Sequence, residues 1–427
     1  MITAAESRSQ LNVSRHEDEV LSAAYYRTLG LKQEEIAQLL GKSIATITRR
    51  LRDAQDAGLL QEKIVLNATP EDLKHIYARV SNRRLGRQIE EHFGKRTLQQ
   101  VLVVPTPSAG MTPAAIRELL GKSAAVHLAS VLTQYSDQQL VGVSFGRTVR
   151  AIADASESVA DPSRDVLDID FIPLTGGLSA LPGPSAGETL SETAEDEQYL
   201  KDAFTYSASE NALTFAEAFR ASASGQLHLP TPAFCPRRYL EGGGTLEHAL
   251  HFVESIPEYQ FILGTTVDGE RDPSALITKL TCAVTSVGGP PNSSGEEQGW
   301  WLGTRGPLLE NELEAITAEG VIGDICGYFI TEDRVSGFSP DSTVHHVNRR
   351  LFGPTPDDFR HCARSALING TPGVIMVAHH SSKARAVLSA IRNECVSTLI
   401  VDEALAHSII ELEPGLGRSP HETRGSQ

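Results

Sequence analysis

Residues that bind metals or form disulfides are scarce in this chain. Its 427 residues include only five cysteines, with neither a CxxC pair nor a mixed Cys/His ligand spacing. Each cysteine lies in or beside an apolar run, so we expect free, buried thiols in a reducing cytosol. The five are Cys235, Cys282, Cys326, Cys362 and Cys395. The adjacent pairs His345-His346 and His379-His380 have no carboxylate or cysteine at ligand spacing, so we expect no metal site and no cofactor.

Long hydrophobic runs are also missing. No stretch approaches the ~18 apolar residues of a membrane-spanning helix, and the N-terminus has no apolar signal core. We therefore expect a cytoplasmic protein that has no membrane partner. The three methionines are too few to build a Met-rich groove for a partner protein.

Positive charge is in deficit. The chain has 38 Lys and Arg against 54 Asp and Glu, a net charge of −16, which argues against a protein that coats nucleic acid with its whole surface. The deficit is uneven, because residues 1–66 carry nine basic and nine acidic residues and the remainder carries 29 and 45. Any contact with DNA must therefore be local and close to the N-terminus.

Three helices are predicted within the neutral N-terminal region. A helical period starts at Glu17 and ends at Leu29-Gly30, a second helix spans 33–40, and a third spans about 44–57. Gly41 permits the tight turn between the last two, and Ser43 is a candidate N-cap of the third helix. The side of the third helix that we expect to face the core consists of Ile44, Ile47, Leu51 and Ala54.

This layout is typical of a helix-turn-helix, whose second helix offers short polar and arginine side chains to bases and phosphates. The candidate DNA contacts are Ser43, Ala45, Thr46, Thr48, Arg49 and Arg52. The alternative is an ordinary three-helix bundle with a solvated polar face. We predict a flexible tail over 1–16, the DNA-binding domain over 17–66, a linker helix over 67–84, an effector domain over 85–412 and a disordered tail over 413–427.

The effector domain alternates short apolar strands with helices. We predict a helix over 85–93 and a strand over 101–104, then one helix starting at Thr112-Pro113 and another over 123–132. The other predicted strands lie near 140–143, 170–175, 280–286, 374–378 and 398–401. The pattern predicts an α/β fold with a doubly wound, Rossmann-like parallel sheet that binds its ligands at the carboxyl ends of the strands. The stretches 182–198 and 289–306 are expected to be surface loops.

One stretch, Leu140-Val-Gly-Val-Ser-Phe-Gly-Arg-Thr-Val149, predicts a binding site for an anion. An apolar strand that turns directly into a helix directs free backbone N–H groups and the positive end of the helix dipole at one point. Ser144, Arg147 and Thr148 add two hydroxyls and a guanidinium there, which suits a phosphate. The alternative is a structural turn with a capping hydroxyl and a surface arginine.

Several segments resemble the SorC (sorbitol operon regulator) family of bacterial transcriptional regulators. Gln33-Glu-Glu-Ile-Ala37 and Thr46-Ile-Thr-Arg-Arg-Leu51 are similar to its DNA-binding domain, and Val141-Gly-Val-Ser-Phe-Gly-Arg-Thr148 resembles its Gly-Val-Ser-Trp-Gly-Arg-Thr. Further matches, in the same order, are Pro173-Leu-Thr-Gly-Gly177, Ile322-Gly-Asp-Ile325, Arg350 before Leu351-Phe-Gly353, Val377-Ala with Lys383-Ala, and Thr398-Leu-Ile-Val-Asp-Glu-Ala404. The resemblance extends from about residue 17 to residue 412.

The resemblance implies an effector domain similar in fold to sugar-phosphate isomerases and deaminases, which binds a phosphorylated sugar. It implies that Ser144, Arg147 and Thr148 hold phosphate or sugar hydroxyls and that two glycines let backbone approach the ligand. The other residues implied to contact the ligand are Gly176, Gly177, Asp324, Arg350 and Lys383. On its own residues, Asp324 could instead cap a helix, and Arg350 could instead form a structural salt bridge.

The chain departs from the family at two functional places. Ile44 replaces an arginine that is usual after the recognition-helix serine, and Lys32 stands where a capping threonine is common. His379-His380 replace a pair of glycines close to the ligand.

We therefore expect a non-enzymatic regulator that binds double-stranded operator DNA as a homodimer or homotetramer and responds to a sugar or sugar phosphate. Two alternatives are a sugar-phosphate isomerase or deaminase-like enzyme, and a DNA binder with a vestigial pocket.

Overall fold

The computed structural model describes residues 15–60, 82–106, 111–134, 138–159, 168–177, 204–221, 227–235, 237–265, 270–290, 308 and 311–413. The predicted N-terminal tail, most of the predicted linker helix and the two predicted surface loops lie largely outside these residues, as does the C-terminal tail from 414 onward. Among the described residues, no helix has both the length and the apolar character needed to cross a membrane.

A six-stranded, entirely parallel sheet forms the centre of the molecule, with the strand order β1-β8-β7-β4-β2-β3. Its strands are β1 (Gln100–Val104), β2 (Gln139–Val143), β3 (Ile169–Pro173), β4 (Cys282–Thr285), β7 (Gly373–Ala378) and β8 (Thr398–Asp402). Each coincides with a strand predicted from the sequence, so the α/β class with a parallel sheet is confirmed. The near-continuous apolar runs are explained by burial on both faces, which is usual for parallel strands.

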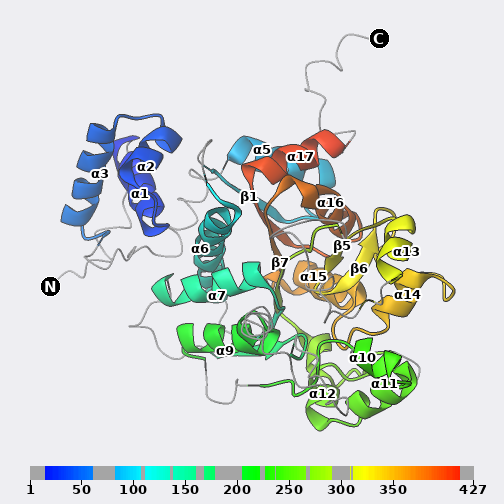
Figure 1. Ribbon diagram of the computed structural model, residues 1–427. Coiled ribbons are helices and arrows are strands. Elements are labelled where there is room, and N and C mark those ends of the chain that lie inside the picture. Colours follow the sequence, from blue (N-terminus) through cyan, green and yellow to red (C-terminus); the bar gives the residue numbers. More distant parts are fainter. Residues whose placement is uncertain are drawn as a thin grey trace, which may run out of the picture.

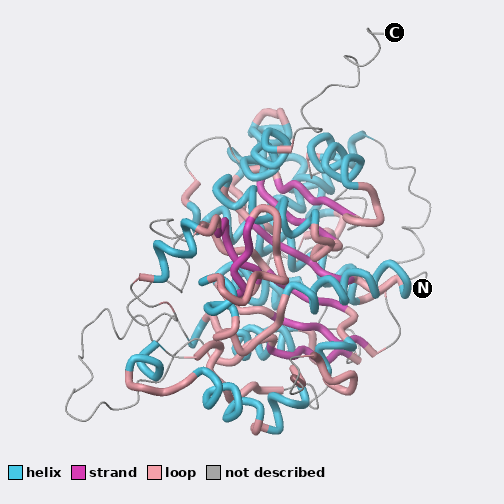
Figure 2. Tube along the Cα trace, turned by 90° about the vertical axis from the view of Figure 1, so that its right-hand side faces the viewer, coloured by secondary structure: helices cyan, strands magenta, loops and turns pink. Residues whose placement is uncertain are grey.

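Helices cover both faces of this sheet, as Figures 1 and 2 show. Alternate side chains of β1 divide between two apolar cores, because Val101 and Val103 point to one face and Leu102 and Val104 to the other. The first face packs against α5 (Arg83–Phe93), α15 (Pro356–Asn369), α16 (Ala384–Arg392) and α17 (Glu403–Leu412). The second packs against α6 (Pro113–Leu132), α7 (Arg147–Val159) and α9 (Ala208–Ala218).

Helix α6 corrects one sequence prediction. Two helices were expected, one from Thr112-Pro113 and one over 123–132, but a single 20-residue helix spans both. Thr112 caps it, since its hydroxyl accepts a hydrogen bond from the Ala115 N–H at 3.2 Å. Gly121 does not interrupt the helix; a Cβ at this position would stand 2.6 Å from the carbonyl oxygen of Ala151. The glycine is therefore needed for the close crossing of α6 and α7.

Smaller elements, which the sequence did not predict, surround the sheet. An antiparallel hairpin of β5 (Val321–Ile325) and β6 (Tyr328–Thr331) lies beside α16. The remaining elements are α10 (Arg237–Glu241), α11 (Leu246–Glu254), α12 (Pro257–Ile262), η2 (Leu276–Lys279), α13 (Glu312–Ala318), α14 (Thr343–Asn348) and η5 (Ser381–Lys383). His345 and His346 lie on α14.

Three helices form the N-terminal unit, residues 15–60, which we call the head. They are α1 (Arg15–Thr28), α2 (Gln33–Leu40) and α3 (Ile44–Asp56), close to the predicted ranges. Ile47, Leu51 and Ala54 are buried as expected, but Ile44 is 48% exposed, so its expected place in the core is wrong. It occupies the first helical position, where the side chain extends beyond the edge of the bundle.

The head shares an apolar core with the effector domain. One continuous cluster of buried side chains includes Val20 and Leu51 of the head, Leu120 of α6, and Val377 of the sheet. Figure 1 shows the head beside α6. No local pattern indicates this contact, because residues 98 positions apart meet in it, as Tyr25 and Ser123 do.

Candidate functional site at the carboxyl ends of the strands

The loop after β2 has the predicted strand–turn–helix geometry. The Ser144 N–H donates to the Val284 carbonyl oxygen at 3.1 Å, which ties the loop to the end of β4. Gly146 has a φ of +115° and its N–H donates to the Tyr206 carbonyl at 2.8 Å. Helix α7 begins directly at Arg147, so its first N–H groups face the carboxyl edge of the sheet.

Both hydroxyls of the predicted anion site are buried. Ser144 is 1% exposed and Thr148 is 6% exposed, whereas Arg147 is half-buried. The Ser144 hydroxyl makes a long, 3.4 Å hydrogen bond to the Phe145 carbonyl and also interacts with the Cys326 thiol. Both interactions are weak, so the hydroxyl remains able to bind a ligand oxygen.

Four side chains gather around the carboxyl ends of β2 and β7, and we call them the cationic cluster: Arg117, Arg147, His379 and Lys383. His379 directly follows β7 and is buried. Burial, together with the nearby charges of Lys383, Arg117, His380 and Arg147, lowers the pKa of His379 to about 3. His379 is therefore neutral at pH 7, close to two arginines and a lysine from three different elements.

Lys383 lies closer to the cluster than the sequence indicated. Its backbone ends the single turn of η5, its N–H donates to the His380 carbonyl at 3.2 Å, and it is 9% exposed. His380 adopts a φ of +80°, and its Nδ1 lies 2.9 Å from the Ser382 hydroxyl. The tight turn directs the lysine back over the strand end.

Arg117 was missed in the sequence analysis. It lies in the first half of α6, a helix otherwise rich in alanine and leucine. The sequence offered little signal, because the same helix also carries Glu118 and Lys122 and an arginine can bury its aliphatic stem while its charge stays accessible.

Asp324 lies on β5, where it caps the hairpin turn and not a helix. Its Oδ1 accepts the Gly327 N–H at 2.8 Å, and it is 5% exposed. The other carboxylate oxygen would stand 1.7 Å from a Cβ at Gly288, so Gly288 must be glycine. Burial raises the pKa of Cys326, which is opposed by hydrogen bonds with Ser144 and with the Phe145 backbone. The hairpin tip therefore reaches the loop after β2.

The two glycines after β3 meet the chain's own backbone. A Cβ at Gly176 would stand 1.8 Å from the Thr231 carbonyl oxygen, and the Gly177 N–H donates to that oxygen at 2.8 Å. The Gly177 carbonyl accepts the Ala233 N–H at 2.7 Å. The need for glycine is thus explained without a ligand, and a ligand contact there stays a prediction.

Arg350 forms the salt bridge that the sequence left open. Its two terminal nitrogens donate to the two Glu312 carboxylate oxygens at 2.6 and 2.7 Å, and both residues are buried. Bidentate pairs of this kind fix the guanidinium firmly. Arg350 therefore has a structural role connecting α13 to the turn before Leu351, and a ligand contact remains an untested prediction.

No group of three potential metal ligands occurs among the described His, Cys, Asp and Glu residues. All five cysteines are buried and free, as the sequence predicted.

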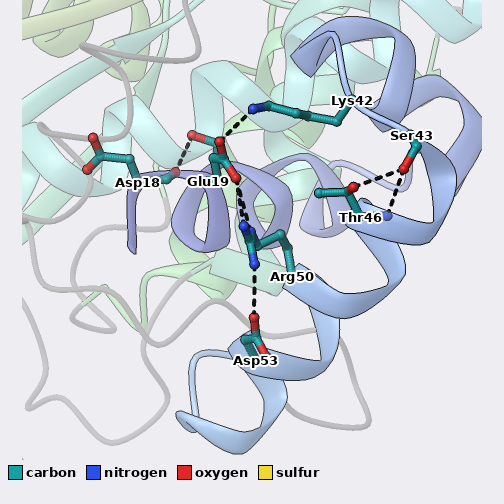
Figure 3. A network of polar contacts seen from close by, with 8 residues as sticks. Asp18, Glu19, Lys42, Ser43, Thr46, Arg50 and Asp53 are labelled. Carbon is teal, nitrogen blue, oxygen red and sulfur yellow. Dashed lines mark hydrogen bonds and ion pairs between the residues drawn. The ribbon is translucent and has the colours of Figure 1, made fainter. Parts of the chain in front are cut away.

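The head presents the predicted polar face of α3 to solvent. Ala45, Thr48, Arg49 and Arg52 are exposed, as is Ser43, while Thr46 is half-buried. Ser43 caps α3 as expected, since its hydroxyl accepts the Thr46 N–H at 3.2 Å (Figure 3). Its hydroxyl also lies 2.9 Å from the Thr46 hydroxyl, so both side chains are held at the start of the helix.

A polar network fixes α3 against the other two helices (Figure 3). The Glu19 carboxylate accepts hydrogen bonds from Lys42 at 2.6 Å and from Arg50 at 2.9 and 3.1 Å. The bonds from Lys42 and then Arg50 lower the pKa of Glu19 to about 2. Arg50 also approaches Asp53 at 3.5 Å. Arg50 is thus committed to the fold, whereas Arg49 and Arg52 point outward.

Known proteins share this sequence pattern and fold. The Bacillus subtilis (strain 168) deoxyribonucleoside regulator is 24% identical over 395 residues, which are 91% of this chain and 96% of that protein. The full-length sorbitol operon regulator SorC from Klebsiella pneumoniae has a TM-score of 0.52 at 18% identity, covering 93% of this chain and 99% of that one. A transcriptional regulator from Streptococcus pneumoniae TIGR4 has a TM-score of 0.50 at 17% identity, covering 77% and 96%.

The family model described as "Putative sugar-binding domain" matches residues 79–221 and 271–411. The stretch that it leaves out, 222–270, contains α10, α11 and α12. The two matched segments contain all six strands of the parallel sheet, the loop after β2 and the cationic cluster. This chain therefore belongs to the sugar-binding domain family.

Proposed function

We propose that this chain is a transcriptional regulator whose binding to operator DNA is gated by a small phosphorylated carbohydrate. The observation that carries the proposal is the cationic cluster. Arg117, Arg147 and Lys383 all act electrostatically on buried His379 at the carboxyl ends of the strands, in a chain with a net charge of −16. Arginine and lysine side chains bind phosphate well, and the carboxyl edge of a doubly wound sheet is where α/β proteins bind phosphorylated ligands.

In this proposal Arg147, Lys383 and Arg117 contact the phosphate, with the Ser144 and Thr148 hydroxyls and the first N–H groups of α7. Asp324 is suited to a sugar hydroxyl, because a carboxylate accepts hydrogen bonds from hydroxyl groups. In this proposal the effector domain resembles the sugar-phosphate isomerases and deaminases in architecture, but it senses its ligand and does not turn it over.

The head supplies the DNA-binding part of the proposal. In the proposal α2 and α3 act as a helix-turn-helix, and the second of these helices exposes Arg49 and Arg52. A homodimer or homotetramer in the cytoplasm would present its α3 helices in pairs to a roughly palindromic operator. The relatives named as regulators of deoxyribonucleoside and sorbitol genes support this assignment.

Thermal stability of the full-length chain, measured with a panel of phosphorylated and free sugars, tests the effector class. A ligand at ~100 times its dissociation constant adds about 2.7 kcal/mol to the free energy of unfolding, so binding raises the melting temperature. We expect stabilisation by sugar phosphates and none by the free sugars. Stabilisation by free sugars alone would contradict the phosphate assignment, and release of product in the same samples would favour an enzyme.

Replacing Arg147 tests the position of the site. Arg147→Met should weaken sugar-phosphate binding by about 1.5–3 kcal/mol, because a charge-assisted hydrogen bond is lost. Arg150→Met is the matched control, since Arg150 lies on the same helix but pairs with Asp154 at 2.7 Å and approaches Glu210 at 3.6 Å. Isothermal titration of both variants measures the effect, and equal affinities would remove Arg147 from the site.

Replacing Arg49 tests the DNA contact. Arg49→Ala should weaken binding to a duplex selected from a random-sequence pool by about 1–3 kcal/mol if the guanidinium contacts a base. Arg364→Ala removes one exposed arginine from α15, far along the chain from the head, and controls for the loss of net charge. Gel-shift titrations at fixed salt give both affinities. An Arg49→Ala chain that binds as tightly as the control would exclude this contact.

A further inference from the structure

Helix α6 connects the cationic cluster to the head. Arg117 belongs to the cluster, and Lys122 and Ser123, only five and six residues further on, contact α1 of the head. With a rise of ~1.5 Å per residue, about 8 Å of helix separates the two sets of contacts. A small displacement of α6 at one end must therefore reach the other.

The contact between α6 and α1 has two directional polar parts. The Tyr25 and Ser123 hydroxyl oxygens lie 3.0 Å apart, and both side chains are buried. The Lys122 ammonium donates to the Leu29 carbonyl at 3.1 Å, at the C-terminal end of α1, where the helix dipole favours a cation. Gly30, with a φ of +84°, turns the chain aside there; a Cβ on it would stand 2.8 Å from the Lys122 nitrogen. The absence of a side chain at Gly30 thus leaves room for the Lys122 ammonium group.

The head also meets the start of α17. Burial raises the pKa of Tyr26, and the nearby Tyr25 and Glu403 raise it further. Glu403 begins α17 and accepts a hydrogen bond from Asn82 at 2.9 Å, just before α5. The hydrogen bonds with α6 hold the head, while Arg49 and Arg52 remain exposed on its outer helix. Docking therefore sets the direction of the DNA-contact face without covering it.

Helices α6 and α7 are in turn closely coupled. Gly121 lies against the backbone of Ala151, with no side chain between the two helices. α7 begins with Arg147, so two members of the cationic cluster lie on two helices that cross at this glycine. An anion bound at the start of α7 therefore acts on the helix against which α6 packs most closely.

We propose, as an extension of the proposed function, that α6 transmits effector binding to the head. An anion in the cationic cluster draws Arg117 and Arg147 together, tightens α6 against α7, and strengthens the hold of Lys122 and Ser123 on α1. Binding of the ligand and binding of DNA are then coupled through the stability of the interface between α6 and α1. A ligand that orders α6 reduces the entropy that is lost when the head is fixed.

Hydrogen exchange of the full-length chain, with and without millimolar inorganic phosphate, tests this mechanism. We expect phosphate to slow the exchange of the amides of residues 25–31 by up to about fivefold. A factor of five is the lower end of typical coupling between sites. Thermal stabilisation by phosphate, measured in the same samples, reports binding separately. Unchanged exchange in a chain that phosphate stabilises would overturn the role of α6 and leave the proposed function intact.

Two variants separate transmission from binding. In Lys122→Met, phosphate should still raise the melting temperature, but the exchange of residues 25–31 should no longer respond. Lys42→Met is the matched control, because Lys42 lies in the head and pairs with Glu19, not with α6; its exchange response should persist. Tyr25→Phe keeps the ring in the core and removes only the hydroxyl contact with Ser123, so it gives a second test should Lys122→Met disturb the head.

The remaining outcomes are also decisive. A Lys122→Met chain whose head still responds to phosphate would exclude the lysine as the connection. Failure of inorganic phosphate to stabilise the wild-type chain would overturn the anion-driven mechanism. A miss across the sugar phosphates as well would overturn the proposed function along with it.

Discussion

Single residues decide whether the N-terminal ends of the helices are capped. At α3 the expected serine is present and bonded, but at α2 the N-cap position is Lys32, whose side chain has no acceptor. Half of a capping box is nevertheless formed, because the Glu35 carboxylate accepts the Lys32 N–H at 2.7 Å. Lys32 is exposed and has the extended backbone of an N-cap, with φ −75° and ψ 159°.

Lys32→Thr should therefore stabilise the head by about 0.5–1.5 kcal/mol, since a threonine hydroxyl completes the capping box. Lys32→Ala removes the same charge without adding an acceptor and serves as the control. Denaturant unfolding of the three full-length chains, followed by circular dichroism, gives the difference. Equal stability of the threonine and alanine variants would show that the cap is not formed.

Whether the role of a site residue could be predicted depended on how far along the chain its partners lie. Ser144, Arg147 and Thr148 were recognisable because their contacts lie within one strand–turn–helix segment. The pairing of Arg350 with Glu312 spans 38 positions and could only be left open. Gly176 was predicted to let backbone approach a ligand, which stays a prediction; the close approach in the structure is to the Thr231 carbonyl oxygen, which no local pattern reveals.

At the scale of elements, the crossing of α6 and α7 is the most constrained contact. Gly121→Ala would place a methyl group 2.6 Å from the Ala151 carbonyl oxygen and 2.9 Å from its Cβ. We expect a loss of about 1–3 kcal/mol in the free energy of unfolding, because backbone must shift to admit the methyl group. Denaturant titration of wild type and variant measures it.

In an unconstrained helix the same substitution would raise the free energy of unfolding. Alanine in place of glycine in a helix interior normally stabilises by roughly 1 kcal/mol. A gain of this size for Gly121→Ala would show that α6 and α7 are not in direct backbone contact.

Elements built on local periodicity were predictable, and elements built on distant partners were not. The six strands were each an apolar run next to a turn signal, so they could be located from the sequence. The β5–β6 hairpin was missed because Val321–Ile325 is paired with the next strand and its Asp324 caps the turn between them. α6 was divided in two, since a glycine within a helix has the same local signature whether it breaks the helix or packs against a neighbour.

At the scale of the whole molecule, two buried histidines make stability depend on pH. Burial lowers the pKa of His127 on α6 to about 4 and is the main reason that the pKa of His379 is about 3. Both are neutral when the chain is folded at pH 7. Unfolding exposes them and restores their ordinary pKa of about 6.5, so below that pH the unfolded chain binds protons that the folded chain does not.

Folding stability should therefore be intact above pH 6.5 and fall as the pH decreases from 6.5 towards 4. Each histidine contributes a slope of up to about 1.4 kcal/mol per pH unit. Denaturant unfolding at pH 7.5, 6.5 and 5.5 measures the slope, and His127→Gln should reduce it. An unchanged slope in that variant would place the sensitivity in other groups.

The apolar core shared by the head and α6 has a consequence for engineering new sensors from this protein. A hybrid could join the head of one regulator to the effector domain of another at a junction between residues 60 and 82. The new head would then face an α6 surface whose side chains do not match it. A working hybrid must carry along the matching face of α6, with Lys122 and Ser123, or redesign it. The natural unit of exchange in this chain is accordingly the head together with one helix of the sheet domain, and not the head alone.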